Sequence, residues 1–316
     1  MGLSDFSALN ALKPDTLILT SSAKSRTSPV DVTQGKRITI DRLSITQIPH
    51  AMRTMGWSTA ASLMERWFQN EAWELPGDFK VKTPPISKLH PSMYDGDIVK
   101  VAWAQRFPRV AEALRDVHGR RFNIAAIQEL CQKLRGVGWD GMRAQALGAD
   151  RMPAAEIDSI CQVNVRPFGA LGDTLDEVYG ALGYASAKVG LIGNAWFEAE
   201  SGRRYFHVKR SALYLRDTYD FTGPQFLGIW TKSRVLTKAE QMAVTVGASN
   251  TPDVASLDEG AFMQVWNHDF NRYRKSTGRG GDFLVFSDVH WVDEDRVIDI
   301  TSAWDSIRGD ADAHVG

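Results

Sequence analysis

Two long segments, residues 186–200 and 203–217, constrain the fold of this chain more than any other feature. Both have the apolar, β-branched and aromatic pattern of extended strands, and the second alternates clearly along its length. Ser201 and Gly202 separate them, and a Ser-Gly pair is typical of a tight turn. The sequence therefore predicts a long antiparallel hairpin.

Helical patterns dominate the region before the hairpin. The clearest helix is residues 123–136, where Asn123 caps an apolar stripe and Gly136 ends it. Further helices are predicted at 48–57, 58–70, 108–119 and 153–161, and strands at 38–45 and 97–107. Residues 172–305 are instead mostly β, with a strand at 282–292 and helices at 174–182, 237–244 and 261–276.

This order of elements predicts an α+β fold. We expect a flexible arm over residues 1–40, a mainly helical region over 41–171, a β-rich activity domain over 172–305, and a frayed tail over 306–316. The β-rich part should be antiparallel and half-barrel-like. Strands do not alternate regularly with helices, which argues against a doubly wound parallel sheet.

Composition and motifs exclude several classes of protein. The formal charge is -1 with no dense basic cluster, so a nucleic-acid partner is not expected. Cys131 and Cys161 lack metal-ligand spacing, and no apolar run reaches about 18 residues, so neither a zinc site nor a transmembrane helix is predicted. The N-terminal segment lacks the features of a signal peptide, so any export should use a route that reads none. P-loop, G-x-S-x-G and H-E-x-x-H motifs are absent.

The segment DTYDF, residues 217–221, ends the second long strand and has two interpretations. As a corner, Asp217 or Asp220 would accept hydrogen bonds from backbone N–H groups two residues on, and Phe221 would anchor the core. As a site, the two carboxylates would bind a divalent metal or act as acid and base, with Tyr219 contacting an anionic group. Local chemistry favours the corner.

A second candidate follows in residues 267–282, where His268, Arg272 and Arg274 precede a Gly-rich turn. Guanidinium groups of Arg272 and Arg279 match phosphate oxygens. The alternative is a solvated basic helix end, with Gly278 supplying the helix C-cap. This alternative is favoured, although arginines beside a glycine turn recur in anion sites.

Three blocks, residues 48–68, 217–230 and 273–289, resemble the signature blocks of a bacterial family of unknown function whose members tend to be encoded near type VI secretion spike components. The resemblance runs from about residue 45 to 295. It implies a setting in bacterial competition, with synthesis in the bacterial cytoplasm and export through a contractile injection apparatus without a signal peptide. A spike or adaptor protein would be a partner.

The C-terminal part is also similar to the catalytic domain of colicin M-type bacteriocins, through Asp217, Tyr219, Asp220 and Phe221. That resemblance implies magnesium-dependent hydrolysis of a lipid-linked peptidoglycan precursor in the target-cell periplasm. The His-Arg pair that follows in those enzymes is absent, because Phe226 and Leu227 stand there.

Two hypotheses follow from these resemblances. In the first, the chain is an antibacterial effector with an immunity protein. Asp217 and Asp220 hold Mg²⁺ or act as base, Tyr219 orients substrate, and a cleft joins them to the basic turn. Arg272, Arg274 or His207 would replace the missing pair, and an arginine within residues 272–279, such as Arg279, would bind the pyrophosphate of the substrate. In the second, the chain is a non-catalytic adaptor or cargo-binding protein, since ten tryptophans suit a docking surface. A pore-forming effector is disfavoured by the lack of a long apolar segment.

Overall fold

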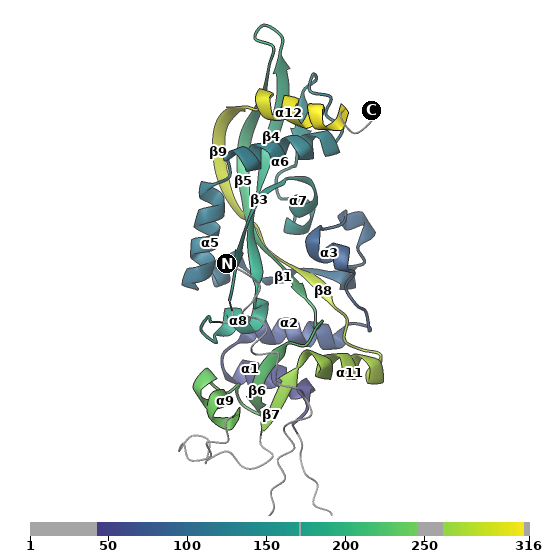
Figure 1. Ribbon diagram of the computed structural model, residues 1–316, viewed down its shortest axis with the longest axis vertical. Helices are drawn as coiled ribbons and strands as arrows, with labels where there is room; N and C mark the ends of the chain where they lie inside the picture. Colours follow the sequence, from purple (N-terminus) through teal and green to yellow (C-terminus); the bar gives the residue numbers. More distant parts are fainter. Residues whose placement is uncertain (1–42, 171, 246–261, 313–316) are drawn as a thin grey trace, which may run out of the picture.

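A long open sheet runs through the molecule, whose structure is a computed structural model describing residues 43–170, 172–245 and 262–312. Within these residues the main sheet has seven strands in the order β1-β8-β5-β4-β2, with β3 also on β4 and β9 also on β5. All neighbours are antiparallel except β1 and β8. Figure 1 shows an elongated molecule with helices packed along the sheet. The predicted α+β fold is confirmed.

The predicted hairpin forms the centre of the sheet. Strands β4 (Ala185–Glu198) and β5 (Arg203–Tyr219) pair from Glu198↔Arg203 to Ser186↔Arg216. The register shifts at Ile192/Gly193, where a Cβ on Gly193 would lie 1.9 Å from the carbonyl oxygen of His207. Consecutive residues of β5 from Ser211 to Arg216 are buried, so both faces of the sheet are covered there.

Each long strand changes its outer neighbour halfway along. The first half of β5 pairs with β9 (His290–Asp299) and the second half with β8 (Phe283–Ser287). Likewise β4 pairs with β2 (Gln145–Leu147) and β3 (Gln162–Phe168). The single strand predicted at 282–292 is therefore divided into β8 and β9. The division occurs because the Ser287 hydroxyl accepts the N–H of Leu215, and the N–H of Asp288 turns to the carbonyl of Val99.

The helices predicted before residue 171 are present. They are α1 (Ile48–Thr54), α2 (Ser58–Gln69), α5 (Pro108–Gly119), α6 (Ile124–Gly136) and α7 (Ala154–Ile160). Short helical segments not predicted are η1 (Ile45–Gln47), α3 (Gly77–Val81), η2 (Ile86–Lys88), η3 (Pro91–Met93) and α4 (Val101–Ala104). After residue 171 lie α8 (Glu177–Leu182) and α9 (Lys238–Thr245), as predicted, and α12 (Thr301–Asp312).

Two expected elements change type part of the way along. The strand predicted at 97–107 ends with β1 (Tyr94–Val99), because Asp288 Oδ1 accepts the N–H of Val101 at 2.6 Å and starts α4. The helix predicted at 261–276 begins as β7 (Phe262–Trp266), which pairs with β6 (Phe226–Thr231). Helix α11 (Asn267–Thr277) starts only where Asp269 accepts the N–H of Trp266.

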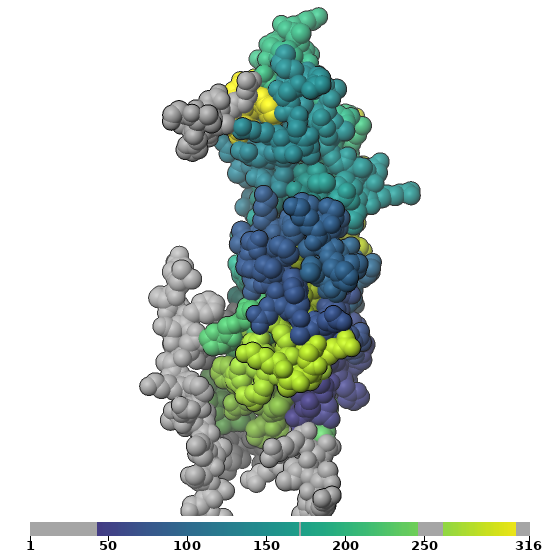
Figure 2. Space-filling view, turned by 90° about the vertical axis from the view of Figure 1, so that its right-hand side faces the viewer, coloured from purple at the N-terminus to yellow at the C-terminus, as the bar shows by residue number. Residues whose placement is uncertain are grey.

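Strands from both predicted regions belong to the same sheet, because β1, β2 and β3 precede residue 171. Figure 2 shows the yellow-green α11 segment beside dark blue segments from the first third of the chain. The predicted arm at 1–40 lies outside the described residues, as does most of the predicted strand at 38–45, whereas η1 includes Ile45. Helix α12 continues past the predicted tail boundary at residue 306 to Asp312.

A buried carboxylate joins the hairpin to α7 and to the segment after α3. Asp158 accepts hydrogen bonds from Lys188 at 2.7 Å, Tyr214 at 2.6 Å and Thr83 at 2.5 Å, and lies 3.4 Å from Arg216 Nε. Burial opposes ionisation, but Lys188 and the hydrogen bonds outweigh it and lower the pKa of Asp158. Buried charges are tolerated only when they are paired in this way.

We expect Asp158→Asn to lower the free energy of unfolding by about 3–5 kcal/mol, because Lys188 and Arg216 would lose their buried countercharge. Chemical denaturation measures the change. Asp150→Asn is the control, since that side chain is 72% exposed and 3.6 Å from Arg210, and it should change stability by less than about 0.5 kcal/mol. Equal effects of the two substitutions would contradict a structural role for the buried group.

Candidate functional site

The DTYDF segment forms a corner at the end of β5. The Asp220 carboxylate accepts the N–H of Thr222 at 3.2 Å and the hydroxyl of Thr222 at 2.5 Å, which is the predicted turn two residues on. Lys80 donates to Asp220 at 2.9 Å and to the Thr222 hydroxyl at 2.8 Å. One carboxylate of the predicted metal pair is thus already paired with an ammonium group.

Helix α11 holds the backbone of this corner. Asn271 Nδ2 donates to the carbonyl of Phe221 at 2.9 Å, and Asn267 Nδ2 donates to the carbonyl of Thr222 at 2.7 Å. Gly223 follows with φ of 77°, a conformation that favours glycine. The chain direction after β5 is therefore fixed by side chains that sequence reasoning did not single out.

The aromatic residues of the segment are packed in the core. Phe221 stacks on Phe270 with ring centroids 3.7 Å apart, and its edge contacts Trp67 at 4.9 Å. Tyr219 stacks on Phe283 at 5.2 Å. Burial raises the pKa of Tyr219, so its hydroxyl remains protonated. Both rings anchor the corner, as the corner interpretation predicts for Phe221.

Arg274 lies in the same core rather than in a cleft. Its Nε donates to the carbonyl of Gly280 at 2.6 Å, its Nη2 pairs with the buried carboxylate of Asp282, and its guanidinium lies 5.3 Å from the Trp67 ring. Asp282 also accepts the indole N–H of Trp67 at 2.9 Å and the N–H of Leu75 at 3.1 Å. The corner and the Gly-rich turn therefore meet around Trp67.

The turn itself behaves as a helix end. Gly278 ends α11 in the left-handed conformation with φ of 68°. Gly280 has φ of 95°, and a Cβ there would lie 2.3 Å from the Trp67 ring. Close approach of the backbone to the indole, rather than to a bound phosphate, accounts for this glycine.

The remaining predicted site residues lie apart. Arg272 is 76% exposed, with its guanidinium 3.9 Å from Asp269, and Arg279 donates to the carbonyl of Gln69 at 3.0 Å. His207 lies in the other half of β5 and pairs with Asp295 at 2.8 Å. Ten residues of strand separate His207 from Asp217, which is roughly 33 Å at about 3.3 Å per residue. The structure does not bring His207 to the corner.

Asp217 differs from the other candidates. It is half-buried, lies opposite Val285, and accepts the backbone N–H of Thr218. Among the described residues no basic side chain forms an ion pair with it. Desolvation, with a smaller contribution from the charge of Asp220, raises its pKa well above the usual range. It is the candidate with the chemistry of a general acid or base.

A magnesium ion at Asp217 and Asp220 would have to compete with Lys80 for Asp220. Among the described residues no group of three or more His, Cys, Asp or Glu side chains is placed to hold a metal ion. A two-carboxylate site completed by water remains consistent with Mg²⁺, which keeps several waters. These two residues would be its protein ligands.

The described cavities do not adjoin this corner. One of about 270 Å³ lies between β1, the loop before α7 and the junction of β8 and β9, and another of about 180 Å³ lies between α5 and the end of β3. None of the predicted site residues lines either one. At the corner itself, Phe221 packs against Phe270 and Trp67.

Sequence reasoning missed Lys80, Trp67 and Asp282 as partners of the candidate residues. Lys80 and Asp220 are separated by 140 positions, so no local pattern links them. A signal did exist for the buried network: Lys188 and Arg216 are charged residues within apolar strands, where an unpaired charge would be costly.

A protein-family model described as a family of unknown function (DUF6402) matches residues 43–302, and the chain belongs to this family. The family description assigns no activity, substrate or partner. Neither a search of curated proteins nor one of solved structures found a match. In the part of the chain that the structure describes, no helix has both the length and the apolar character needed to cross a bilayer.

We expect Asp217→Asn to stabilise the protein at neutral pH. A raised folded-state pKa means that the native state holds the proton more tightly, so stability falls as pH rises from about 3.9, the ordinary value, through the folded pKa. Thermal unfolding from pH 4 to 8 should show the difference between variant and wild type growing with pH. A constant difference would contradict the raised pKa.

We expect Arg274→Met to lower the free energy of unfolding by about 3–5 kcal/mol, because it leaves the buried Asp282 carboxylate unpaired. Arg272→Met is a matched control on the same helix, and its exposed side chain should contribute less than about 0.5 kcal/mol. Chemical denaturation compares them. Loss of a cellular activity in Arg274→Met without loss of stability would indicate a catalytic rather than a structural arginine.

Proposed function

We propose that the protein acts by binding, as an adaptor or cargo-binding protein of a type VI secretion spike. The observation that carries this proposal is a partly exposed aromatic cluster formed by Phe226 on β6, Trp266 at the end of β7 and His268 at the start of α11. Phe226 and Trp266 have ring centroids 4.9 Å apart, and His268 stacks on Trp266 at 6.3 Å. Phe226 is 39% exposed. Exposed aromatic rings of this kind dominate the energetics of protein interfaces.

The residue at position 226 also favours a binding function over a catalytic one. Phe226 occupies the place of the histidine that the colicin M-type motif requires, so a catalytic imidazole is replaced by an apolar ring. Asp220, Tyr219 and Arg274 are engaged in the contacts of the corner. The type VI setting comes from the sequence blocks, and export through the injection apparatus belongs to the same proposal.

Asp217 supports a second candidate function, which is catalytic. An unpaired carboxyl with a raised pKa at a strand end suits a Mg²⁺-dependent phosphoesterase that attacks a lipid-linked envelope precursor. The protein would then be an antibacterial effector acting in the target-cell periplasm, accompanied by an immunity protein. Asp217 and Asp220 would hold the metal and activate water.

Binding is tested with purified chain and purified spike or adaptor proteins from the same bacterium, by calorimetry. We expect a complex with one of them, weakened about tenfold or more by Phe226→Ser, since hot-spot truncation costs at least about 2 kcal/mol. Val297→Ser is the control, because that side chain is 54% exposed on β9, which belongs to the main sheet and does not pair with β6 or β7. Equal loss in both variants, or no complex, would contradict the proposal.

Expression in a susceptible bacterium separates the two candidates. The binding proposal predicts normal growth from the cytoplasm and from the periplasm. Killing only from the periplasm that disappears with Asp217→Ala, but persists with Asp295→Ala, would support the phosphoesterase. Asp295 suits the comparison because its side chain is 93% exposed.

A further inference from the structure

The cavity of about 270 Å³ lies where β5 exchanges β9 for β8. Its walls come from β1, from the residues around the β8–β9 junction, and from the loop that enters α7. It is slightly smaller than the range of about 300–1,000 Å³ typical of drug-sized ligands, so it suits a smaller molecule.

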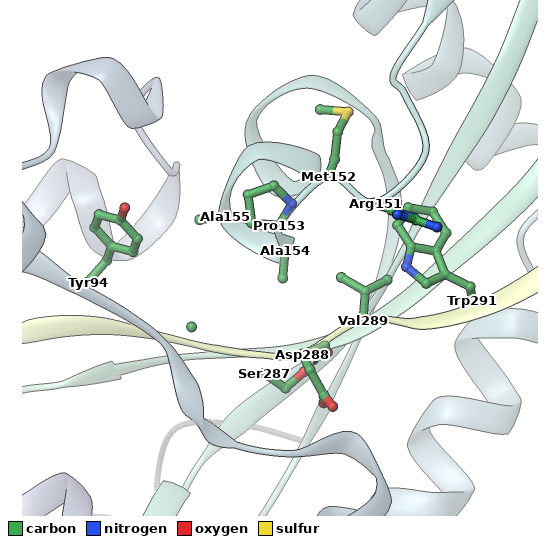
Figure 3. Close-up of a pocket in the computed structure, with 11 residues that line it drawn as sticks. Tyr94, Arg151, Met152, Pro153, Ala154, Ala155, Ser287, Asp288, Val289 and Trp291 are labelled. Carbon is green, nitrogen blue, oxygen red and sulfur yellow. Dashed lines mark hydrogen bonds between the residues drawn. The ribbon is translucent and has the colours of Figure 1, made fainter.

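Apolar groups form the body of this cavity, and hydrogen-bond donors lie around them. Pro153, Ala154 and Val289 line it together with Tyr94, Arg151 and Trp291. Figure 3 shows Val289 pointing toward Ala154, with Arg151 and the indole of Trp291 together on one side and Tyr94 on the other. Among the described residues, none bonds to the Tyr94 hydroxyl, the Trp291 indole N–H or the Arg151 guanidinium.

Arg151 brings a positive charge to the wall of the cavity. Asp288 also lines it, but its Oδ1 accepts the N–H of Val101 at 2.6 Å, and Figure 3 shows the carboxylate turned away from the other labelled side chains. Trp291 is fixed from outside by Arg210, whose guanidinium lies 4.8 Å from the indole ring. Arg210 is itself neutralised by Asp293 at 2.9 Å. Arg151 and Asp288 are thus the two charged lining residues, and Arg151 lies beside the Trp291 indole whereas the Asp288 carboxylate is turned away.

The backbone of Arg151 supplies a separate observation. Its φ is 63°, and in the described part of the chain it is the non-glycine residue with positive φ. That conformation is unfavourable for an arginine and costs little for glycine or asparagine. Strain of this kind concentrates at ligand sites, where the side chain is needed at that position.

We propose that this cavity binds a small organic anion, a monocarboxylate with an apolar body. Arg151 would pair with the carboxylate, Trp291 beside it would donate a further hydrogen bond, and Val289, Pro153, Ala154 and the ring of Tyr94 would contact the apolar part. The inference is independent of the docking proposal, because it uses none of the residues of the aromatic cluster formed by Phe226, Trp266 and His268.

Calorimetry with the full chain tests this site, using phenylacetate as the probe. Phenethylamine has the same ring with the opposite charge, and acetate and inorganic phosphate carry the charge without the ring. We expect phenylacetate to bind, phenethylamine to give no binding heat, and acetate and phosphate to bind about tenfold or more weakly than phenylacetate. Binding of phenethylamine or phosphate as tight as that of phenylacetate would overturn the proposal.

Arg151→Asn is the decisive variant, since asparagine accepts positive φ and the fold should be as stable as wild type or more so. It should weaken phenylacetate binding by about ten- to a hundredfold, the loss of a charge-assisted contact. Arg143→Asn is the matched control, because that arginine is 84% exposed and bound to Asp140. Unchanged binding in Arg151→Asn, or equal weakening in the control, would overturn the assignment.

Discussion

The rest of the molecule depends on the buried ion pairs that Asp158 forms with Lys188 and Arg216. Arg216, held by this carboxylate, donates to the carbonyls of Phe79 and Lys80 at 2.5 and 3.1 Å and so fixes the C-terminal part of α3. The side chain of Lys80 then reaches Asp220 at the corner. The buried carboxylate of Asp158 thereby acts on the DTYDF corner without touching it. Through Arg216 and α3 it positions Lys80, the cation that pairs with Asp220.

Similarity of a short motif does not fix the role of its residues, and the DTYDF segment shows why. Alternation along a strand places Asp217 and Tyr219 on one face, and the turn then directs Phe221 into the core. The same residues can act in catalysis when they line a cleft, and they stabilise the fold when they form a packed corner. Here Phe221 packs against Phe270 and Trp67, and Tyr219 stacks on Phe283.

Local patterns predicted the fold wherever they were unambiguous. The central hairpin and the helices with a cap and an apolar stripe were found from sequence, as was the turn at Asp220. Residues 261–276 were assigned wholly to a helix, because alternation over five residues of β7 is too short to outweigh the aromatic spacing that follows it. Pairing with β6 decides that segment, and pairing is a tertiary effect.

The exchange of β9 for β8 along β5 has a consequence for synthesis on the ribosome. Both outer partners of β5 come from residues 283–299, and β1 pairs with β8 across roughly 190 positions of chain. The edge of a seventeen-residue strand therefore stays open while about 80 further residues are translated, which takes several seconds at about 5–20 residues per second. During that interval β5 is exposed to pairing with other chains, and chaperone binding to the nascent hairpin would protect it.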